Sequence, residues 1–126
     1  MLNCGDTFYA GDDEDVEPHL QVVVTPPHHG EVITVSITTK HACSESLVVL
    51  RVNDHPFIKW DSVVSYGYAA IRKVADIESA IHNGRAAKRD PISPHILRKI
   101  RMGLKDSEFT PNGVRHFYFD LSIEED

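Results

Sequence analysis

The sequence predicts an α+β domain: a small β-barrel or strongly bent antiparallel sheet of five to six strands, with two helices in the C-terminal half of the chain. Short runs rich in β-branched and aromatic residues, separated by turns, fill residues 5–71. Helical spacing of apolar residues begins only after residue 76. Because helices do not alternate with strands, the pattern excludes a parallel βαβ sheet.

The clearest strand signal is Glu31–Thr39, in which β-branched residues alternate with period two. His19–Thr25 precedes it and contains three consecutive valines, which predicts burial on both faces. The turn between these runs holds two prolines and a glycine, which cannot continue a strand. A hairpin of the two runs would bring His19 beside Thr38 and Thr39.

Other short segments complete the expected sheet. The remaining strands are expected at Gly5–Tyr9, Ser46–Val52 and Ser62–Ile71, with a last edge strand at Phe117–Phe119. Within the third of these, period two would place Tyr66 and Tyr68 on one face.

Two helices are expected after the strands. Asp76 is a candidate N-cap for a helix over Ile77–His82, which Asn83 and Gly84 would end. Ser93 followed by proline begins the second helix. Its apolar side chains recur on one helical face at Ile96, Leu97, Ile100 and Leu104.

Composition indicates one domain over residues 1–126, without a membrane span or a signal peptide. Cys4 and Cys43 lack any motif spacing, so we expect reduced thiols and a cytoplasmic protein.

The net charge of -6 argues against a broad nucleic-acid surface. Acidic residues gather at 12–17 and 124–126, and basic ones at 72–101. The basic region suits an anionic partner, although a solvated helix face is the simpler interpretation.

Several segments within residues 3–82 resemble the MazF/PemK family of toxin endoribonucleases. Gly5-Asp6-Thr7-Phe8 is similar to the Gly-Asp and apolar strand that open the family's domain. Val35–Thr39 is similar to its strand ending in Ile-Thr-Ser, and Asp61–Val64 to a later strand. His55-Pro56-Phe57-Ile58, before a strand with Ser-Val and tyrosine, also resembles a group of uncharacterised bacterial proteins.

The resemblance implies an SH3-like barrel that cleaves single-stranded RNA without a metal, acts as a homodimer and is held by a protein antitoxin. The family's catalytic threonine corresponds to Thr38. The sequence departs from the family where an arginine followed by proline usually precedes the second strand, because His19 and Leu20 stand there. The segments Asn53–Ile58 and Ser93–Lys105 also fit the family poorly.

Histidine can replace the missing arginine as an acid or base, since its unperturbed pKa is ~6.5. In this hypothesis His19 moves a proton and Thr38 and Thr39 orient phosphate oxygens. His55 is a further candidate, with Asp54 before it as an orienting group. The RNA-binding candidates are Lys40, His41, Tyr66 and Tyr68, and Trp60 is another ring suited to stacking. Each of these residues also has an ordinary structural explanation, as a strand end, a turn or a core side chain.

No cofactor motif is recognised, and we expect no cofactor and no metal. His28 and His29 lack a third ligand at a typical metal-site spacing, although His41 or Cys43 would be of the right type. An alternative to the enzyme is a non-catalytic SH3-like barrel that binds a protein or nucleic-acid partner. The missing arginine and the negative charge favour this alternative, whereas Thr38 and the histidines favour the enzyme.

Overall fold

The computed structural model describes residues 2–10, 18–41 and 44–121. In this part of the chain, six antiparallel strands form one curled sheet of half-barrel shape, in the order β4-β5-β3-β2-β1-β6, and three helices lie in the C-terminal half. The predicted α+β class with a strongly bent sheet is therefore confirmed. The acidic segments at 12–17 and 124–126 and Cys43 lie outside the described residues.

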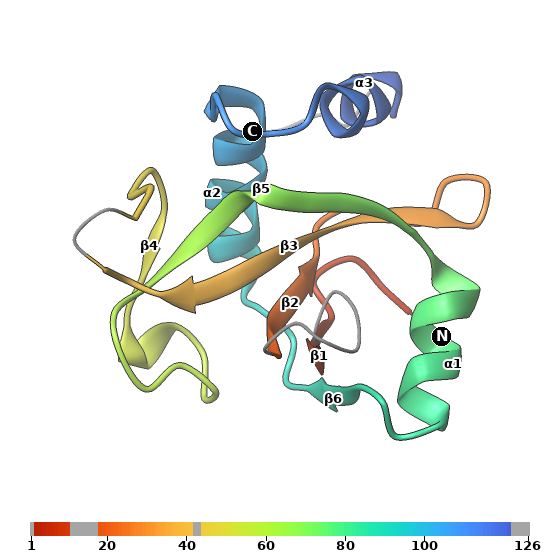
Figure 1. The fold of residues 1–126 in the computed structure, drawn as a ribbon, viewed down its shortest axis with the longest axis horizontal. Helices are drawn as coiled ribbons and strands as arrows, with labels where there is room; N and C mark the ends of the chain where they lie inside the picture. Colours follow the sequence, from red (N-terminus) through yellow and green to blue (C-terminus); the bar gives the residue numbers. More distant parts are fainter. Residues whose placement is uncertain (1, 11–17, 42–43, 122–126) are drawn as a thin grey trace.

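The elements follow one another along the chain with short connections (Figure 1). In order they are β1 (Thr7–Ala10), β2 (His19–Val23), β3 (Glu31–Thr39), β4 (Val49–Leu50), the 3-10 turn η1 (Val52–Asp54), β5 (Ser62–Lys73), α1 (Val74–His82), β6 (Ala87–Arg89), α2 (Pro94–Asp106) and α3 (Asn112–Asp120).

The predicted hairpin between the second and third strands is confirmed. Leu20 lies opposite Ile37, and Val23 opposite Thr34. β3 has the bounds that its alternation predicted, and the consecutive valines of β2 are fully buried. They are buried on both faces because Val22 belongs to one hydrophobic cluster and Val23 to the other.

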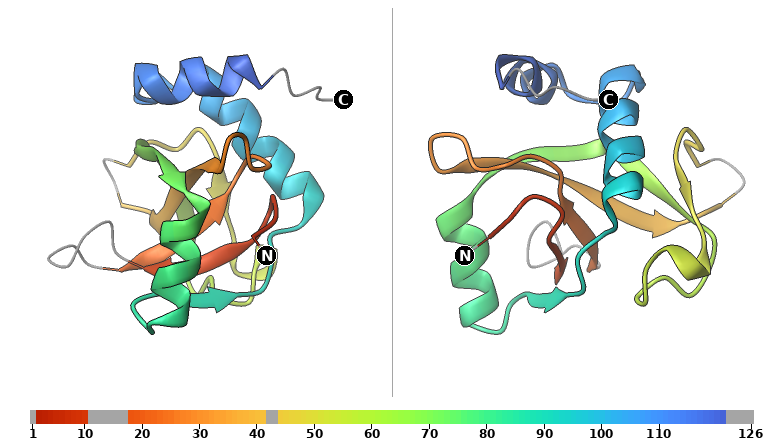
Figure 2. Two further views of the ribbon diagram at one scale, coloured as in Figure 1. Left: turned by 90° about the vertical axis from the view of Figure 1, so that its right-hand side faces the viewer. Right: turned by 180° about the vertical axis from the view of Figure 1, so that it is seen from behind.

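Helices cover the two faces of the sheet (Figure 2). The larger cluster joins one face to α2 and α3 through Ile96, Ile100 and Tyr118. On the other face, Ile77 of α1 packs with Val23 and other apolar side chains. The sheet is thus the middle layer of the domain, and its apolar side chains hold the helices on either side.

β5 contains a large bulge where it pairs with β3. Thr34 lies opposite Ala70, whereas Ser36 lies opposite Ser65, so β5 has extra residues between these two pairs. The bulge interrupts the alternation, and Tyr66 is fully buried while Tyr68 is 62% exposed. The prediction that these two tyrosines share a face was therefore wrong.

The C-terminal prediction of an edge strand at Phe117–Phe119 was also wrong, because this segment belongs to α3. Val114 and Tyr118 are the buried residues of that helix, and their spacing of four is helical. The third helix therefore adds to the two that were predicted. The sixth strand is β6, which pairs with β1 at one edge of the sheet.

The bounds of β4 and α1 differ from the predicted ones for local reasons. Only Val49–Leu50 of the expected Ser46–Val52 strand pairs with β5, because the chain then turns into η1. α1 begins at Val74, so Asp76 lies in its first turn and not at the N-cap. A carboxylate there still interacts favourably with the N-terminal end of the helix dipole.

Cys4 carries a free thiol beside Arg101 of α2, whose guanidinium also donates to the Val24 carbonyl at 2.7 Å. Burial raises the pKa of this thiol, and Arg101 opposes the shift.

Among the described residues, no helix is both long and apolar enough to cross a bilayer.

Gly103 of α2 is required by close packing. A Cβ built on this glycine would lie 2.0 Å from the Tyr66 hydroxyl oxygen and 2.9 Å from a Val48 methyl carbon. We expect Gly103→Ala to lower the free energy of unfolding by about 1–3 kcal/mol, because the core cannot accept the extra carbon without shifting. Urea unfolding followed by circular dichroism measures this change.

The matched control is Gly113→Ala in α3, where the added carbon meets no atom within 4 Å other than its chain neighbours and the backbone of its own helix. That change should be neutral or stabilising by up to about 1 kcal/mol, since alanine favours a helix over glycine. If Gly103→Ala and Gly113→Ala changed the free energy of unfolding equally, the close packing described for Gly103 would be contradicted.

Candidate functional site

A cleft of about 290 Å³ opens at the end of the sheet where β2 begins and β3 ends. The sheet contributes Tyr9, His19, Leu20, Ile37, Thr39 and Ser62 to its lining, and Pro18 lies just before β2. The loop before β5 contributes Phe57, Ile58, Lys59 and Trp60. We call this site the Trp60 cleft.

The floor of the Trp60 cleft follows from strand register. Ile37, Leu20 and Tyr9 lie opposite one another on β3, β2 and β1, and Ser62 of β5 lies opposite Thr39 at the other side of β3. Neighbouring strands lie about 4.8 Å apart, so this row of four strands spans about 14 Å. The long direction of the cleft floor therefore runs across the strands and not along them.

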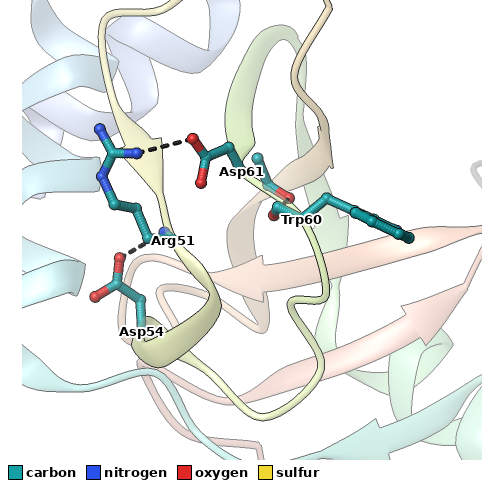
Figure 3. Close-up of polar contacts among 5 residues, drawn as sticks. Arg51, Asp54, Trp60 and Asp61 are labelled. Atoms are coloured by element: carbon teal, nitrogen blue, oxygen red, sulfur yellow. Dashed lines mark hydrogen bonds and ion pairs between the residues drawn. The ribbon is translucent and has the colours of Figure 1, made fainter.

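The wall of the cleft is the loop between η1 and β5, which carries Phe57, Ile58 and Trp60. Ile58 is buried in the larger hydrophobic cluster. The Phe57 ring packs against Tyr9 with centroids 4.8 Å apart. Trp60 is 70% exposed, and its indole extends away from the neighbouring polar groups (Figure 3).

Polar contacts hold the loop at both ends. The Arg51 backbone N–H donates to Asp54 at 2.7 Å, and its guanidinium pairs with Asp61 at 2.8 Å (Figure 3). At the other end, the Ser62 hydroxyl donates to the Trp60 carbonyl at 2.8 Å. Arg51 and Asp61 are both exposed, so their ion pair contributes at most about 1 kcal/mol to stability.

His55 joins this loop to the opposite side of the sheet. Its Nδ1 accepts a hydrogen bond from the Phe57 N–H at 3.0 Å, so Nε2 carries the proton and donates to the Asp90 carbonyl, just after β6. The Thr7 hydroxyl donates to the same carbonyl at 2.6 Å. The His55 side chain is buried, and both its ring nitrogens have partners.

These contacts define a structural role for His55. Asp54, expected to orient the imidazole, instead accepts from the Arg51 backbone. His55 also lines a second cavity, of about 540 Å³, which lies on the β6 side of Phe57. The residues of this cavity, which we call the Arg89 pocket, are His55, Pro56, Phe57, Lys88, Arg89, Asp90 and Pro91.

The structure places His19 and Thr39 together in the Trp60 cleft, with His19 at the residue that opens β2. Thr38 does not line the cleft, and its hydroxyl shares a 2.8 Å hydrogen bond with Ser65. Within the described chain, no hydrogen bond joins His19 to Thr38.

The four RNA-binding candidates do not form one surface. Lys40 and His41 are exposed just beyond β3, and the Lys40 N–H donates to the Asp61 carbonyl at 2.9 Å. Tyr66 is buried, and its hydroxyl donates to the Ile100 carbonyl at 2.8 Å. Burial, with a smaller contribution from nearby carboxylates, raises the pKa of Tyr66 far above its usual value, so the phenol remains a donor. Tyr68 is exposed on the bulge, away from the cleft.

Sequence reasoning missed Tyr9, Phe57 and Lys59 as members of the site. Two weak signals for these residues are present in the sequence. Tyr9 lies near the end of a predicted strand, and Lys59 has aromatic neighbours. For metals, the described ranges contain no group of three histidine, cysteine, aspartate or glutamate side chains that is suited to hold an ion.

Comparison with known proteins adds no relative: no family model matches the chain, and no curated protein matches it.

Replacing His55 tests its structural role. We expect His55→Ala to lower the free energy of unfolding by about 2–4 kcal/mol, because the Phe57 N–H and the Asp90 carbonyl lose their partner in a buried site. His55→Gln, which keeps a donor near the Nε2 position, should be milder. Urea unfolding measures both variants, with His116→Ala on the exposed side of α3 as the control. A fully stable His55→Ala protein would contradict the role.

Proposed function

We propose that this protein is a MazF/PemK-like barrel that binds single-stranded RNA in the Trp60 cleft. The observation that carries the proposal is the combination of side chains in that cleft. Three aromatic residues, Tyr9, Phe57 and Trp60, line it together with Lys59 and His19. Proteins that bind single strands combine aromatic platforms for bases with positive charge for the backbone.

The aromatic side chains suit stacking on bases. Trp60 is 70% exposed, so its ring face is accessible without any rearrangement. Tyr9 and Phe57 form a packed pair held by β1 and by the His55 contacts. A pre-formed platform loses little side-chain entropy when a base stacks on it.

The local charge also favours a phosphate backbone, although the chain carries -6 overall. Lys59 and Lys40 are exposed at the cleft and just beyond β3. The nearby carboxylate of Asp61 is paired with Arg51 at 2.8 Å. Because Arg51 neutralises this carboxylate, Asp61 opposes a phosphate near Lys59 less than a free carboxylate would.

The dimensions of the cleft favour a short single strand. The row of strands that forms its floor spans about 14 Å, which matches about four stacked nucleotides at about 3.4 Å each. In a duplex, the paired and stacked bases offer no free face to Trp60. Binding by stacking on Trp60 therefore favours unpaired RNA.

Trp60 provides its own assay because it is the only tryptophan of the chain. Titration with a randomised single-stranded RNA hexamer, with 2′-fluoro sugars to block cleavage, should quench its fluorescence. Phe57→Ala should weaken binding about 5- to 100-fold, since a base–aromatic stack contributes about 1–3 kcal/mol. A matching RNA duplex should bind poorly.

Two exposed aromatic residues elsewhere are the controls for this measurement. Tyr68→Ala on β5 and Phe119→Ala on α3 remove exposed rings outside the cleft. Both variants should bind like the unmodified protein. Unchanged Trp60 fluorescence in the presence of RNA, or equal losses in all three variants, would overturn the proposed site.

A second candidate function is cleavage of the bound RNA, which His19 specifically favours. His19 and Thr39 are both among the residues that line the cleft, and no described residue hydrogen-bonds to the imidazole of His19. A histidine in that position suits the transfer of a proton to or from ribose or phosphate oxygens. In this form the protein is a toxin-type, metal-independent endoribonuclease with a protein antitoxin.

Cleavage is tested with ordinary single-stranded RNA in EDTA. If His19 moves the proton, His19→Ala should reduce the rate at least about 100-fold, while Trp60 quenching by the 2′-fluoro hexamer remains. Thr39→Ala should slow the reaction more than Thr38→Ala, because only Thr39 lines the cleft. Binding without any cleavage by the unmodified protein would leave the non-catalytic barrel as the function.

A further inference from the structure

The Trp60 cleft and the Arg89 pocket share one residue, Phe57, as a common wall. The Phe57 ring contacts Tyr9 in the cleft at 4.8 Å between centroids. The guanidinium carbon of Arg89 lies 5.1 Å from the centroid of the same ring. The two cavities are therefore neighbours along one surface, separated by a single aromatic side chain.

Strand register places the pocket on the same line as the floor of the cleft. Tyr9 lies opposite Ala87 on β6, and Lys88 and Arg89 follow directly on that strand. β6 is the edge of the sheet, so the row of strands below the cleft ends at the strand that carries these two cations. A strand of RNA that crosses the cleft would reach them next.

The lining of the pocket contains more cations than carboxylates. Lys88 and Arg89 are exposed cations, against the one carboxylate of Asp90 in the lining. Lys88 is 3.6 Å from Asp6, but its side chain remains 52% exposed. The Arg89 guanidinium donates only a long bond of 3.4 Å to the Lys88 carbonyl, and no described carboxylate pairs with it.

We propose that the Arg89 pocket is a second subsite of the RNA path, in which Lys88 and Arg89 bind the phosphates of nucleotides beyond those held in the Trp60 cleft. This inference rests on the proposed function, because it extends the same ligand. Arg89 suits phosphate binding because its guanidinium is steadied over the Phe57 ring and its planar N–H groups match a bidentate phosphate contact. The pocket thus sets the length of RNA that the protein binds.

The test compares randomised 2′-fluoro RNA of four and of ten nucleotides, with Trp60 fluorescence as the readout. The decamer should bind about tenfold tighter than the tetramer. Arg89→Ala and Lys88→Ala should each weaken the decamer and leave the tetramer unchanged. For each variant the slope of log affinity against log salt for the decamer should fall by about 0.7, the value for one lost phosphate contact on a single strand.

The control is Arg98→Ala, which removes an exposed cation from α2 outside both cavities. It should leave both oligomers unchanged. Arg89→Lys separates charge from ring packing: it should retain most of the decamer affinity if phosphate binding is the role of the side chain. Lys88→Ala is informative in its own right, since no ring contact of Phe57 involves Lys88.

The outcomes distinguish failure of the second subsite from failure of RNA binding in the Trp60 cleft. Equal affinity for tetramer and decamer, with quenching by both, would overturn the second subsite and leave the cleft intact. Equal loss in Arg98→Ala and Arg89→Ala would show general electrostatic attraction and also overturn the subsite. No quenching by either oligomer would overturn the proposed function itself.

Discussion

The structure depends on the hydrogen bonds that His55 makes across the open side of the curled sheet. β4 and β6 are the two edges of that sheet and do not pair with each other. His55 bridges the gap by accepting from the Phe57 N–H and donating to the Asp90 carbonyl, which also accepts from Thr7. One buried side chain thus replaces a closing strand pair, and it fixes Phe57 between two cavities.

The bulge in β5 has an equally wide effect. It allows a long strand to follow the curve of β3 and then lead into α1. It also turns Tyr66 into the core, where its hydroxyl meets the carbonyl of Ile100 on α2 and its ring requires glycine at 103. The helix that covers the larger cluster is therefore positioned by the irregular part of the sheet.

The sequence predicts the local parts of this structure well. The register of β2 and β3, which brings the start of β2 beside the end of β3, follows from period two and one turn. β6 was missed because Ala-Lys-Arg has no apolar alternation, and its pairing with β1 is set by tertiary contacts. Trp60 was named as a ring suited to stacking, but the role of Phe57 beside it was missed. His55 holds the Phe57 segment through Asp90, which is 35 positions away, and no sequence period encodes that contact.

The pairing of β1 with β6 has a consequence for folding kinetics. Thr7 and Arg89 face each other from opposite parts of the chain, whereas β2 and β3 are joined by a short turn. Closing a long loop costs more chain entropy than closing a hairpin, so non-local strand pairs form slowly. We expect the β2–β3 hairpin to form early and the β6 edge to be added late. The Arg89 pocket then belongs to the part of the molecule that assembles last and opens most readily.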